Sequence, residues 1–277
     1  MLNPPLPFRG NKSVIRKDLI KLLNNEALND DSIIYVDLFG GSLYISYLIH
    51  QLKPNNEIIT NDYDNYIERL MNIDKTNELL NKINEITKNS NIKHNEKIDD
   101  ENTLAIKQLI QQASYLDINT IASSLLFSGT SVNTKDELLN KTYYNRLNNN
   151  SYNINKDIIN NYIEGLEIVR CDWYELYNKY RDNDKVLFIA DPPYFNTDCS
   201  GYKNTNFSIQ DTLQTLDILK HEKFIYCTSP KSLLLEILAY LKSSHNIGLH
   251  DYTVINVQKT NVNKTCKKND DVILYRF

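Results

Sequence analysis

The carboxyl-terminal third of the chain contains the stretch Val186-Leu187-Phe188-Ile189-Ala190-Asp191-Pro192-Pro193-Tyr194. Its first five residues form an apolar run that is too short and too rich in β-forming residues for a helix, so they predict a buried central strand. Two consecutive prolines then end the strand and hold the next turn rigid. Open α/β sheets bind ligands at the carboxyl ends of their strands. The stretch therefore predicts a strand of an α/β sheet with a ligand site at its end.

The turn Asp191-Pro192-Pro193-Tyr194 offers groups that suit one kind of ligand. It presents a carboxylate, two proline carbonyl oxygens, and an aromatic ring that can lie flat on a planar substrate. These groups fit an amino group on a flat heterocycle. The alternative is a structural turn, in which Asp191 caps the backbone and Tyr194 packs against the core.

The composition is that of an ordinary soluble globular protein, with 277 residues, 41% hydrophobic and 24% charged. This length fits one large domain, or one core domain that carries an insertion. The four cysteines form no C-x-x-C pair and the five histidines show no metal-ligand spacing, so we expect no metal site. We find neither a signal peptide nor an apolar run long enough to span a bilayer, so we expect a cytoplasmic protein that does not contact a membrane.

The amino-terminal part of the chain predicts a second strand unit. A strand over residues 33–39 is followed by Gly40-Gly41-Ser42, in which the serine can cap a helix that runs to residue 49. The next strand, over residues 57–60, is followed by Asp62. A strand, a glycine turn, a helix and a strand ending in an acid form the first unit of a nucleotide-binding α/β sheet.

The middle of the chain has a different pattern. Between residues 67 and 163, helical leucine and isoleucine patterns alternate with polar stretches, and we find no convincing parallel strand. We therefore predict a mainly helical insertion at 67–163 within an α/β domain formed by residues 1–66 and 164–277.

The carboxyl-terminal part returns to strands and helices. Two terminal strands, 252–258 and 271–277, predict an antiparallel hairpin, so we expect a mostly parallel seven-stranded sheet that ends in this pair. The other elements expected here are a strand at 167–171, a helix from the N-cap Asp172 to residue 181, a helix from the capping box Ser208–Asp211 to about residue 221, a strand at 223–227 and a helix opened by Ser229-Pro230.

The glycine turn and the acid after the second strand predict a nucleotide-like cofactor. Phe39-Gly40-Gly41-Ser42 lacks the third glycine of a dinucleotide fingerprint, so a nicotinamide cofactor is disfavoured. S-adenosylmethionine fits better, because it has a ribose diol and a cationic sulfonium but no pyrophosphate. Asp62 is the candidate acid for the ribose, and the alternative for it is a cap at the end of the strand.

The chain resembles the Dam-type DNA adenine methyltransferases (D12 class, alpha group), which have a Rossmann-like fold that binds S-adenosylmethionine. The Asp-Pro-Pro-Tyr turn matches the motif of amino-methyltransferases. Further segments that resemble the family follow in the family's order: 8–12, 36–42, Asn61-Asp62, 168–173, 201–208 and 269–275.

This resemblance implies methyl transfer from S-adenosylmethionine to N6 of adenine in a short specific sequence of double-stranded DNA, with the base flipped out. It implies that Asp191 and Pro192 accept hydrogen bonds from the amino group and that Tyr194 stacks on the base. The catalytic residues implied are Asp191, Pro192, Pro193 and Tyr194. The cofactor-binding residues implied are Phe8, Gly10, Asn11, Lys12, Asp37, Phe39, Gly40, Gly41, Ser42, Asp62, Asp172, Trp173 and Asp191.

The resemblance assigns DNA recognition to the insertion at 67–163, but the glycine and proline pattern of the family's specificity hairpin is missing there. The net charge of −4 argues mildly against a nucleic-acid partner, although a local basic face matters more than the sum. Polar, basic and aromatic residues in three regions are the candidates for DNA contact. They are Asn133, Lys141, Tyr144, Arg146, Tyr202, Lys203, Asn206, Lys264, Lys267 and Lys268.

Three alternatives to this function stay open. One is an RNA adenine methyltransferase, another is a protein glutamine methyltransferase, and the third is an inactive nucleic-acid-binding homologue. Asp191 argues against the second, because glutamine methylation usually goes with Asn-Pro-Pro-Tyr. A restriction endonuclease is a candidate partner, as in restriction-modification systems, and we expect a monomer.

Overall fold

The computed structural model describes residues 2–127, 130, 132–147, 154–194, 207–221, 223–244, 251–257 and 271–277. Seven strands in this part of the chain form one sheet in the order β3-β2-β1-β4-β5-β7-β6. The first five are parallel, and β7 is antiparallel to both β5 and β6. The predicted mostly parallel seven-stranded sheet with an antiparallel terminal pair is therefore confirmed. The strands are β1 (Ile34–Asp37), β2 (Glu57–Asn61), β3 (Glu167–Val169), β4 (Val186–Ala190), β5 (Phe224–Thr228), β6 (Thr253–Val257) and β7 (Asp271–Arg276).

The predicted central strand is β4, which pairs with β1 on one side and β5 on the other. Each of its five residues is buried, because helices cover both faces of the sheet. Leu187 and Ile189 face a core that includes α1 (Arg16–Leu23) and α2 (Tyr44–Leu52). Phe188 faces the opposite core, which includes α9 (Trp173–Tyr180), η3 (Thr215–Lys220) and α11 (Leu234–Ser244). The strand places its carboxyl end in the middle of the sheet edge.

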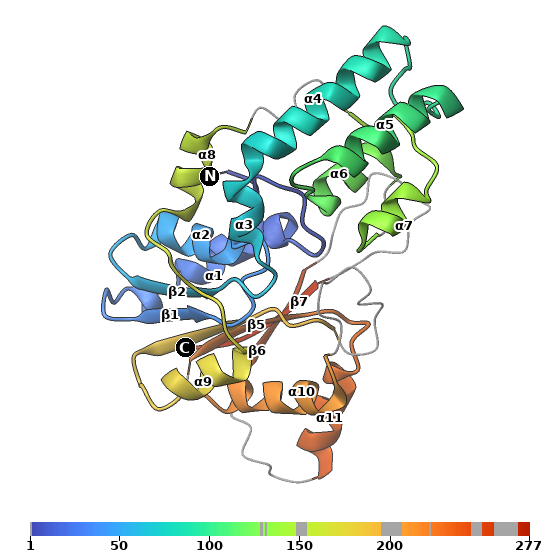
Figure 1. The fold of residues 1–277 in the computed structure, drawn as a ribbon. Helices are drawn as coiled ribbons and strands as arrows, with labels where there is room; N and C mark the ends of the chain where they lie inside the picture. The colour runs from blue at the N-terminus through green and yellow to red at the C-terminus, as the bar shows by residue number, and fades with distance from the viewer. Residues whose placement is uncertain are drawn as a thin grey trace.

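Helices fill the chain between β2 and β3 in its described part. Figure 1 shows α4, α5, α6 and α7 grouped beyond one end of the sheet, and they share a separate apolar core. By contrast, α3 and α8 pack with α2 in a cluster rich in tyrosines. The elements are α3 (Tyr66–Met71), α4 (Ile73–Asn89), α5 (Asp100–Gln112), α6 (Ile118–Leu125), α7 (Lys135–Leu139) and α8 (Lys156–Ile163). The division into domains stays a prediction.

Two of the predicted helix caps are confirmed. The Asp172 carboxylate accepts from the backbone N–H groups of Tyr174 and Glu175 at the start of α9. Ser208 and Asp211 form the expected capping box at the start of α10 (Ile209–Gln214). The expected single helix to residue 221 is, however, divided, because α10 passes into the 3₁₀ helix η3.

Two other caps are wrong. The N-cap of α2 is Leu43, whose backbone is left-handed (φ 60°) and which makes no side-chain cap, so Ser42 lies one position too early. After β5, Ser229 accepts from Lys231 N and Ser232 N in a turn, and α11 begins only at Leu234. In both places a tight turn separates the serine from the helix.

Two short 3₁₀ helices complete the amino-terminal region. They are η1 (Lys12–Ile15), which leads directly into α1, and η2 (Glu26–Leu28), which precedes β1. Asn11 caps η1 by accepting from Ser13 N. No helix in the described part of the chain is long and apolar enough to cross a membrane.

Candidate active site

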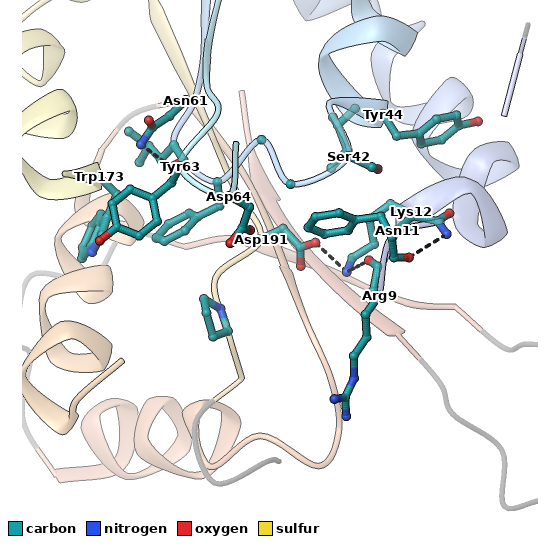
Figure 2. Close-up of a pocket in the computed structure, with 18 of the residues that line it drawn as sticks. Arg9, Asn11, Lys12, Ser42, Tyr44, Asn61, Tyr63, Asp64, Trp173 and Asp191 are labelled. Carbon is teal, nitrogen blue, oxygen red and sulfur yellow. Dashed lines mark hydrogen bonds and ion pairs between the residues drawn. The ribbon is translucent and has the colours of Figure 1, made fainter. Parts of the chain in front are cut away.

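A cavity of about 310 Å³ lies at the carboxyl ends of the strands, where the loops after β1, β2, β3 and β4 meet the segment before η1. Figure 2 shows side chains from these separate segments around one space. This is the edge at which open α/β sheets bind ligands. The residues that line the cavity are Phe8, Arg9, Gly10, Asn11, Lys12, Leu38, Phe39, Gly40, Gly41, Ser42, Tyr44, Ile45, Asn61, Tyr63, Asp64, Asp172, Trp173, Asp191, Pro193, Phe207 and Asp211.

Most of the predicted cofactor residues lie in this lining, and Asp37 and Asp62 do not. The sequence reasoning missed Arg9, Leu38, Tyr44, Ile45, Asn61, Tyr63, Asp64, Phe207 and Asp211. Several of these residues are immediate neighbours of predicted ones. A search that extended each motif by one or two positions would have found them.

The glycine turn after β1 brings backbone close to its neighbours. A Cβ atom on Gly40 would lie 2.7 Å from Thr60 Cγ2 and 2.8 Å from Asn61 O. Gly41 has a φ of 53°, in the left-handed region that favours glycine, and a Cβ there would lie 3.0 Å from the ring of Phe8. The turn therefore needs both glycines. Both line the cavity, and neither has a side chain that would occupy it.

Asp37 lies beneath this turn and not in the cavity. Its carboxylate accepts from Ser46 Oγ at 2.8 Å and from Phe39 N at 3.2 Å. Burial raises the pKa of Asp37 to about 7, although these two hydrogen bonds oppose the rise. Its contacts hold the loop after β1 against α2.

Asp62 is 3% exposed, and its carboxylate caps α3. It accepts from Tyr66 N at 2.6 Å and from Ile67 N at 2.9 Å. Burial raises its pKa, and the two hydrogen bonds oppose that rise. The acid that lines the cavity at the end of β2 is Asp64, beside Tyr63. Because Asp62 and Asp64 are only two positions apart, the sequence could have suggested either.

Asn61 connects three of the loops that form the cavity. Its Nδ2 donates to Leu38 O at 3.2 Å and to Cys171 O at 3.0 Å, and its Oδ1 accepts from Cys171 N at 3.1 Å. The side chain is fully buried. Asn61 thus ties the end of β2 to the loops after β1 and β3.

One side of the cavity is aromatic. The ring centroids of Phe39 and Trp173 are 5.2 Å apart, and those of Phe39 and Phe207 are 6.1 Å apart. Tyr63 is a further aromatic residue in the lining. A planar heterocycle would find ring faces and apolar edges here.

The turn after β4 forms another part of the lining. Asp191 and Pro193 line the cavity, whereas Pro192 is buried. The Nζ atom of Lys12 lies 2.6 Å from Asp191 Oδ2, and it also donates to the hydroxyl of Tyr194 at 3.1 Å. Burial raises the pKa of Asp191, and the ammonium of Lys12 opposes the rise.

The four predicted DNA-contacting residues that the structure describes do not line the cavity. Tyr144 and Arg146 gather around Phe127, with ring centroids of Tyr144 and Phe127 4.5 Å apart and the Arg146 guanidinium 5.0 Å from the Phe127 ring. Arg146 also donates to Asn95. Asn133 and Lys141 are exposed. Tyr202, Lys203, Asn206, Lys264, Lys267 and Lys268 lie outside the described residues.

A search of the described residues for three or more histidine, cysteine, aspartate or glutamate side chains that could hold a metal ion finds no such group.

The chain is similar to known proteins over most of its length. The sequence model of a family described as D12 class N6 adenine-specific DNA methyltransferase matches residues 8–246. A protein of Haemophilus influenzae Rd, named "Putative methyltransferase", is 31% identical over 283 residues, which cover 99% of this chain and 92% of the relative. Among solved structures, precorrin-6y C5,15-methyltransferase from Geobacter metallireducens covers 97% of this chain and 92% of its own, at 11% identity. Its TM-score of 0.35 is too low to support an argument.

Proposed function

The chain belongs to the D12 class N6 adenine-specific DNA methyltransferase family, and on this basis we propose that it methylates N6 of adenine in a short specific sequence of double-stranded DNA. Membership implies S-adenosylmethionine as the methyl donor. The observation that carries the proposal for this chain is the position of Asp191, which lines the cavity at the end of the central strand β4.

The cavity fits S-adenosylmethionine in the chemistry of its walls. The aromatic side of Phe39, Trp173 and Phe207 suits the adenine ring, and Asp64, which lines the same cavity, would accept from the ribose hydroxyls. Asp62 then has a supporting role, because its cap of α3 fixes the loop that carries Asp64. When bound, the cofactor supplies an electrophilic methyl group on a sulfonium.

The turn after β4 would position the amino group that receives the methyl. The N6 lone pair of adenine is delocalised into the ring, so the free amine is a poor nucleophile. Hydrogen bonds from N6 to the Asp191 carboxylate and to the Pro192 carbonyl would pull the nitrogen towards sp³ geometry and direct its lone pair into the cavity. This is electrostatic positioning of the reacting atom.

The target base must leave the duplex to reach this turn, because its amino group is paired within the stack. The ring of Tyr194 would stack on the flipped base. We assign duplex contact to the helical part at 67–163, where the Phe127, Tyr144 and Arg146 group combines aromatic rings with a cation. The Arg146 guanidinium would contact phosphate or bases.

The proposal is tested by methyl transfer from tritiated S-adenosylmethionine to unmethylated double-stranded DNA, single-stranded DNA, RNA and free protein. We expect transfer to the duplex, with N6-methyladenine in one sequence context when the DNA is read by single-molecule sequencing. Transfer to RNA or protein with none to DNA would overturn the assignment of substrate.

The role of Asp191 is tested by Asp191→Asn, which keeps the shape but removes the charge. We expect kcat to fall by about 10²–10³-fold, because one stabilising group at the reacting centre is lost. Asp182→Asn is the matched control, since the side chain of Asp182 is 92% exposed. Near-native transfer by Asp191→Asn would show that the carboxylate does not act on the amino group.

A further inference from the structure

Lys12 is a buried lysine whose ammonium is surrounded by groups of the protein itself. Its side chain is 7% exposed, and that of Asp191 is 18% exposed. Nζ lies 2.6 Å from Asp191 Oδ2, 3.1 Å from Gly10 O and 3.1 Å from the Tyr194 hydroxyl. Figure 2 shows the Lys12 side chain directed at Asp191, whereas the Arg9 side chain extends away from it.

These contacts account for the whole donor capacity of the ammonium. A protonated lysine has three N–H donors and no acceptor. The carboxylate, the carbonyl and the hydroxyl take one donor each. This arrangement leaves no N–H of Lys12 for a cofactor, although the family resemblance implies that Lys12 binds it.

We infer that Lys12 is a positioning residue for the catalytic turn, Asp191-Pro192-Pro193-Tyr194. Lys12 keeps Asp191 ionised and fixes one of its oxygens, so that the other oxygen can accept from the adenine amino group. The inference rests on the function proposed above, because it specifies how the carboxylate is prepared for that reaction.

The Tyr194 hydroxyl closes this arrangement. It accepts from Lys12 and makes a side-chain hydrogen bond with Asp191. The hydroxyl is therefore held at the carboxylate. Lys12 belongs to η1, whereas Asp191 and Tyr194 belong to the turn after β4. The contact therefore joins the amino-terminal segment that lines the cavity to the predicted catalytic residues.

The charges around Asp191 show why it needs this lysine. Burial and the nearby carboxylate of Asp271 on β7 raise the pKa of Asp191, whereas Lys12 and Tyr194 lower it. The other titratable groups that interact with Asp191 are Asp37 at the end of β1 and the buried Tyr226 and Cys227 of β5, and none of them is a cation. Within the described residues, Lys12 is the cation that the surroundings of Asp191 provide.

Lys12 keeps its proton in this site. Burial alone would lower the pKa of Lys12, but the Asp191 carboxylate in direct contact with it raises this pKa well above its ordinary value. Lys12 is therefore an ammonium, and its charge stabilises the ionised form of Asp191. Without Lys12, the remaining influences on Asp191 would favour the protonated acid, which is a weaker acceptor.

The sign of the expected pH effect follows from this. Transfer needs the ionised Asp191, so it is lost as the pH falls through the pKa of that group. In Lys12→Met this pKa rises by about 1–3 pH units, because an opposite charge in direct contact is removed. We therefore expect the loss of kcat at low pH to begin about 1–3 pH units higher in Lys12→Met than in the native protein, and kcat to recover as the pH is raised.

Cofactor binding provides the readout that separates positioning from binding. Trp173 is the single tryptophan of the chain and lines the cavity, so its fluorescence reports S-adenosylmethionine directly. We expect Lys12→Met to bind the cofactor within a few-fold of the native protein. Lys17→Met is the matched control, because Lys17 is exposed on the adjoining helix α1. It should leave affinity, kcat and pH profile unchanged.

A titration that does not depend on activity distinguishes this inference from the proposed function. The carboxyl carbon of Asp191, assigned by its absence in Asp191→Asn, is followed by NMR in protein labelled with ¹³C-aspartate. A raised pKa in Lys12→Met supports the inference even if the native protein methylates no DNA, an outcome that would refute only the proposed function. If Lys12→Met does not fold, Tyr194→Phe serves instead, and we expect a smaller rise.

Two results would overturn the inference. One is an unchanged Asp191 titration and pH profile in Lys12→Met. The other is a large loss of cofactor affinity with an unchanged pH profile, which would make Lys12 a cofactor ligand instead.

Discussion

Asn61 offers a test of how the cavity is held together, because its amide is the link between three strand ends. We consider Asn61→Ala, which removes the hydrogen bonds to Leu38 O, Cys171 O and Cys171 N. The loops that follow these residues carry Phe39 and Trp173. The substitution should therefore reduce both the stability of the fold and the affinity for the cofactor.

The magnitude follows from the number of bonds. Each hydrogen bond contributes about 1 kcal/mol net, so the free energy of unfolding should fall by about 3 kcal/mol. For a protein of this size, that loss lowers Tm by roughly 6 °C. Looser loops should weaken S-adenosylmethionine binding by about tenfold, which corresponds to about 1.4 kcal/mol.

A second asparagine provides a matched control at the opposite end of the strands. Asn56 Nδ2 donates to Asp30 O at 2.9 Å and to Ile33 O at 3.0 Å, before β1 and far along the strand from the cavity. Asn56→Ala should cost about 2 kcal/mol of stability by the same reasoning, without a change in cofactor binding.

Thermal unfolding gives the stability of both variants, and quenching of Trp173 fluorescence gives the cofactor Kd. The assays are made well below the Tm of either variant, so that unfolded protein does not contribute to the Kd. The reasoning is refuted if Asn61→Ala binds the cofactor as tightly as the native protein, or if Asn56→Ala weakens binding equally.

Two further substitutions test buried charges. Asp117→Ala leaves the guanidinium of Arg69 without its carboxylate partner at 3.0 Å in a buried site, so urea unfolding should show a loss of about 3–5 kcal/mol. The exposed pair of Lys156 and Asp74 is the control, and Asp74→Ala should cost less than about 1 kcal/mol; equal losses would contradict the argument. Asp37 has a pKa raised from 3.8 to about 7, so the folded state binds its proton more tightly than the unfolded chain. Its contribution to stability is present at low pH and is lost as the pH rises from about 4 to about 7, by at most about 1.4 kcal/mol per pH unit. Asp37→Asn should flatten stability over this range, and an unchanged slope would exclude Asp37 as the cause.

The sheet could be predicted from the sequence because its signals are local. The apolar run of β4 is bounded by Pro192, and the strand before Gly40 is bounded by the glycine turn, so both strands could be located without knowledge of their neighbours. Their burial on both faces explains why five apolar residues follow one another in β4. The two terminal strands could likewise be predicted from the local sequence pattern alone.

Caps and side-chain directions were less predictable, because they depend on the exact path of a turn. Serine is a favoured residue type for an N-cap, but Leu43 after it has a left-handed backbone, so α2 begins one position later than predicted. At the end of β2, Asn65 is also left-handed, and the turn directs Asp62 to the helix and places Asp64 on the cavity. Composition favours an acid in this loop but does not distinguish between the two acids.

The contact between Lys12 and the turn after β4 could not be predicted from the sequence, because the two segments are far apart along the chain. Lys12 and Tyr194 are separated by 182 positions, and no pattern in either segment predicts that the two side chains are in contact. The resemblance implies a role for each residue separately, cofactor binding for Lys12 and both catalysis and cofactor binding for Asp191, and it implies no contact between them. The fold supports the positioning role inferred above, because a buried ammonium satisfies its donors with the nearest strong acceptors, and two of these acceptors, Asp191 and Tyr194, belong to the turn after β4. A residue can therefore lie in the predicted cavity and still act on the protein rather than on the ligand.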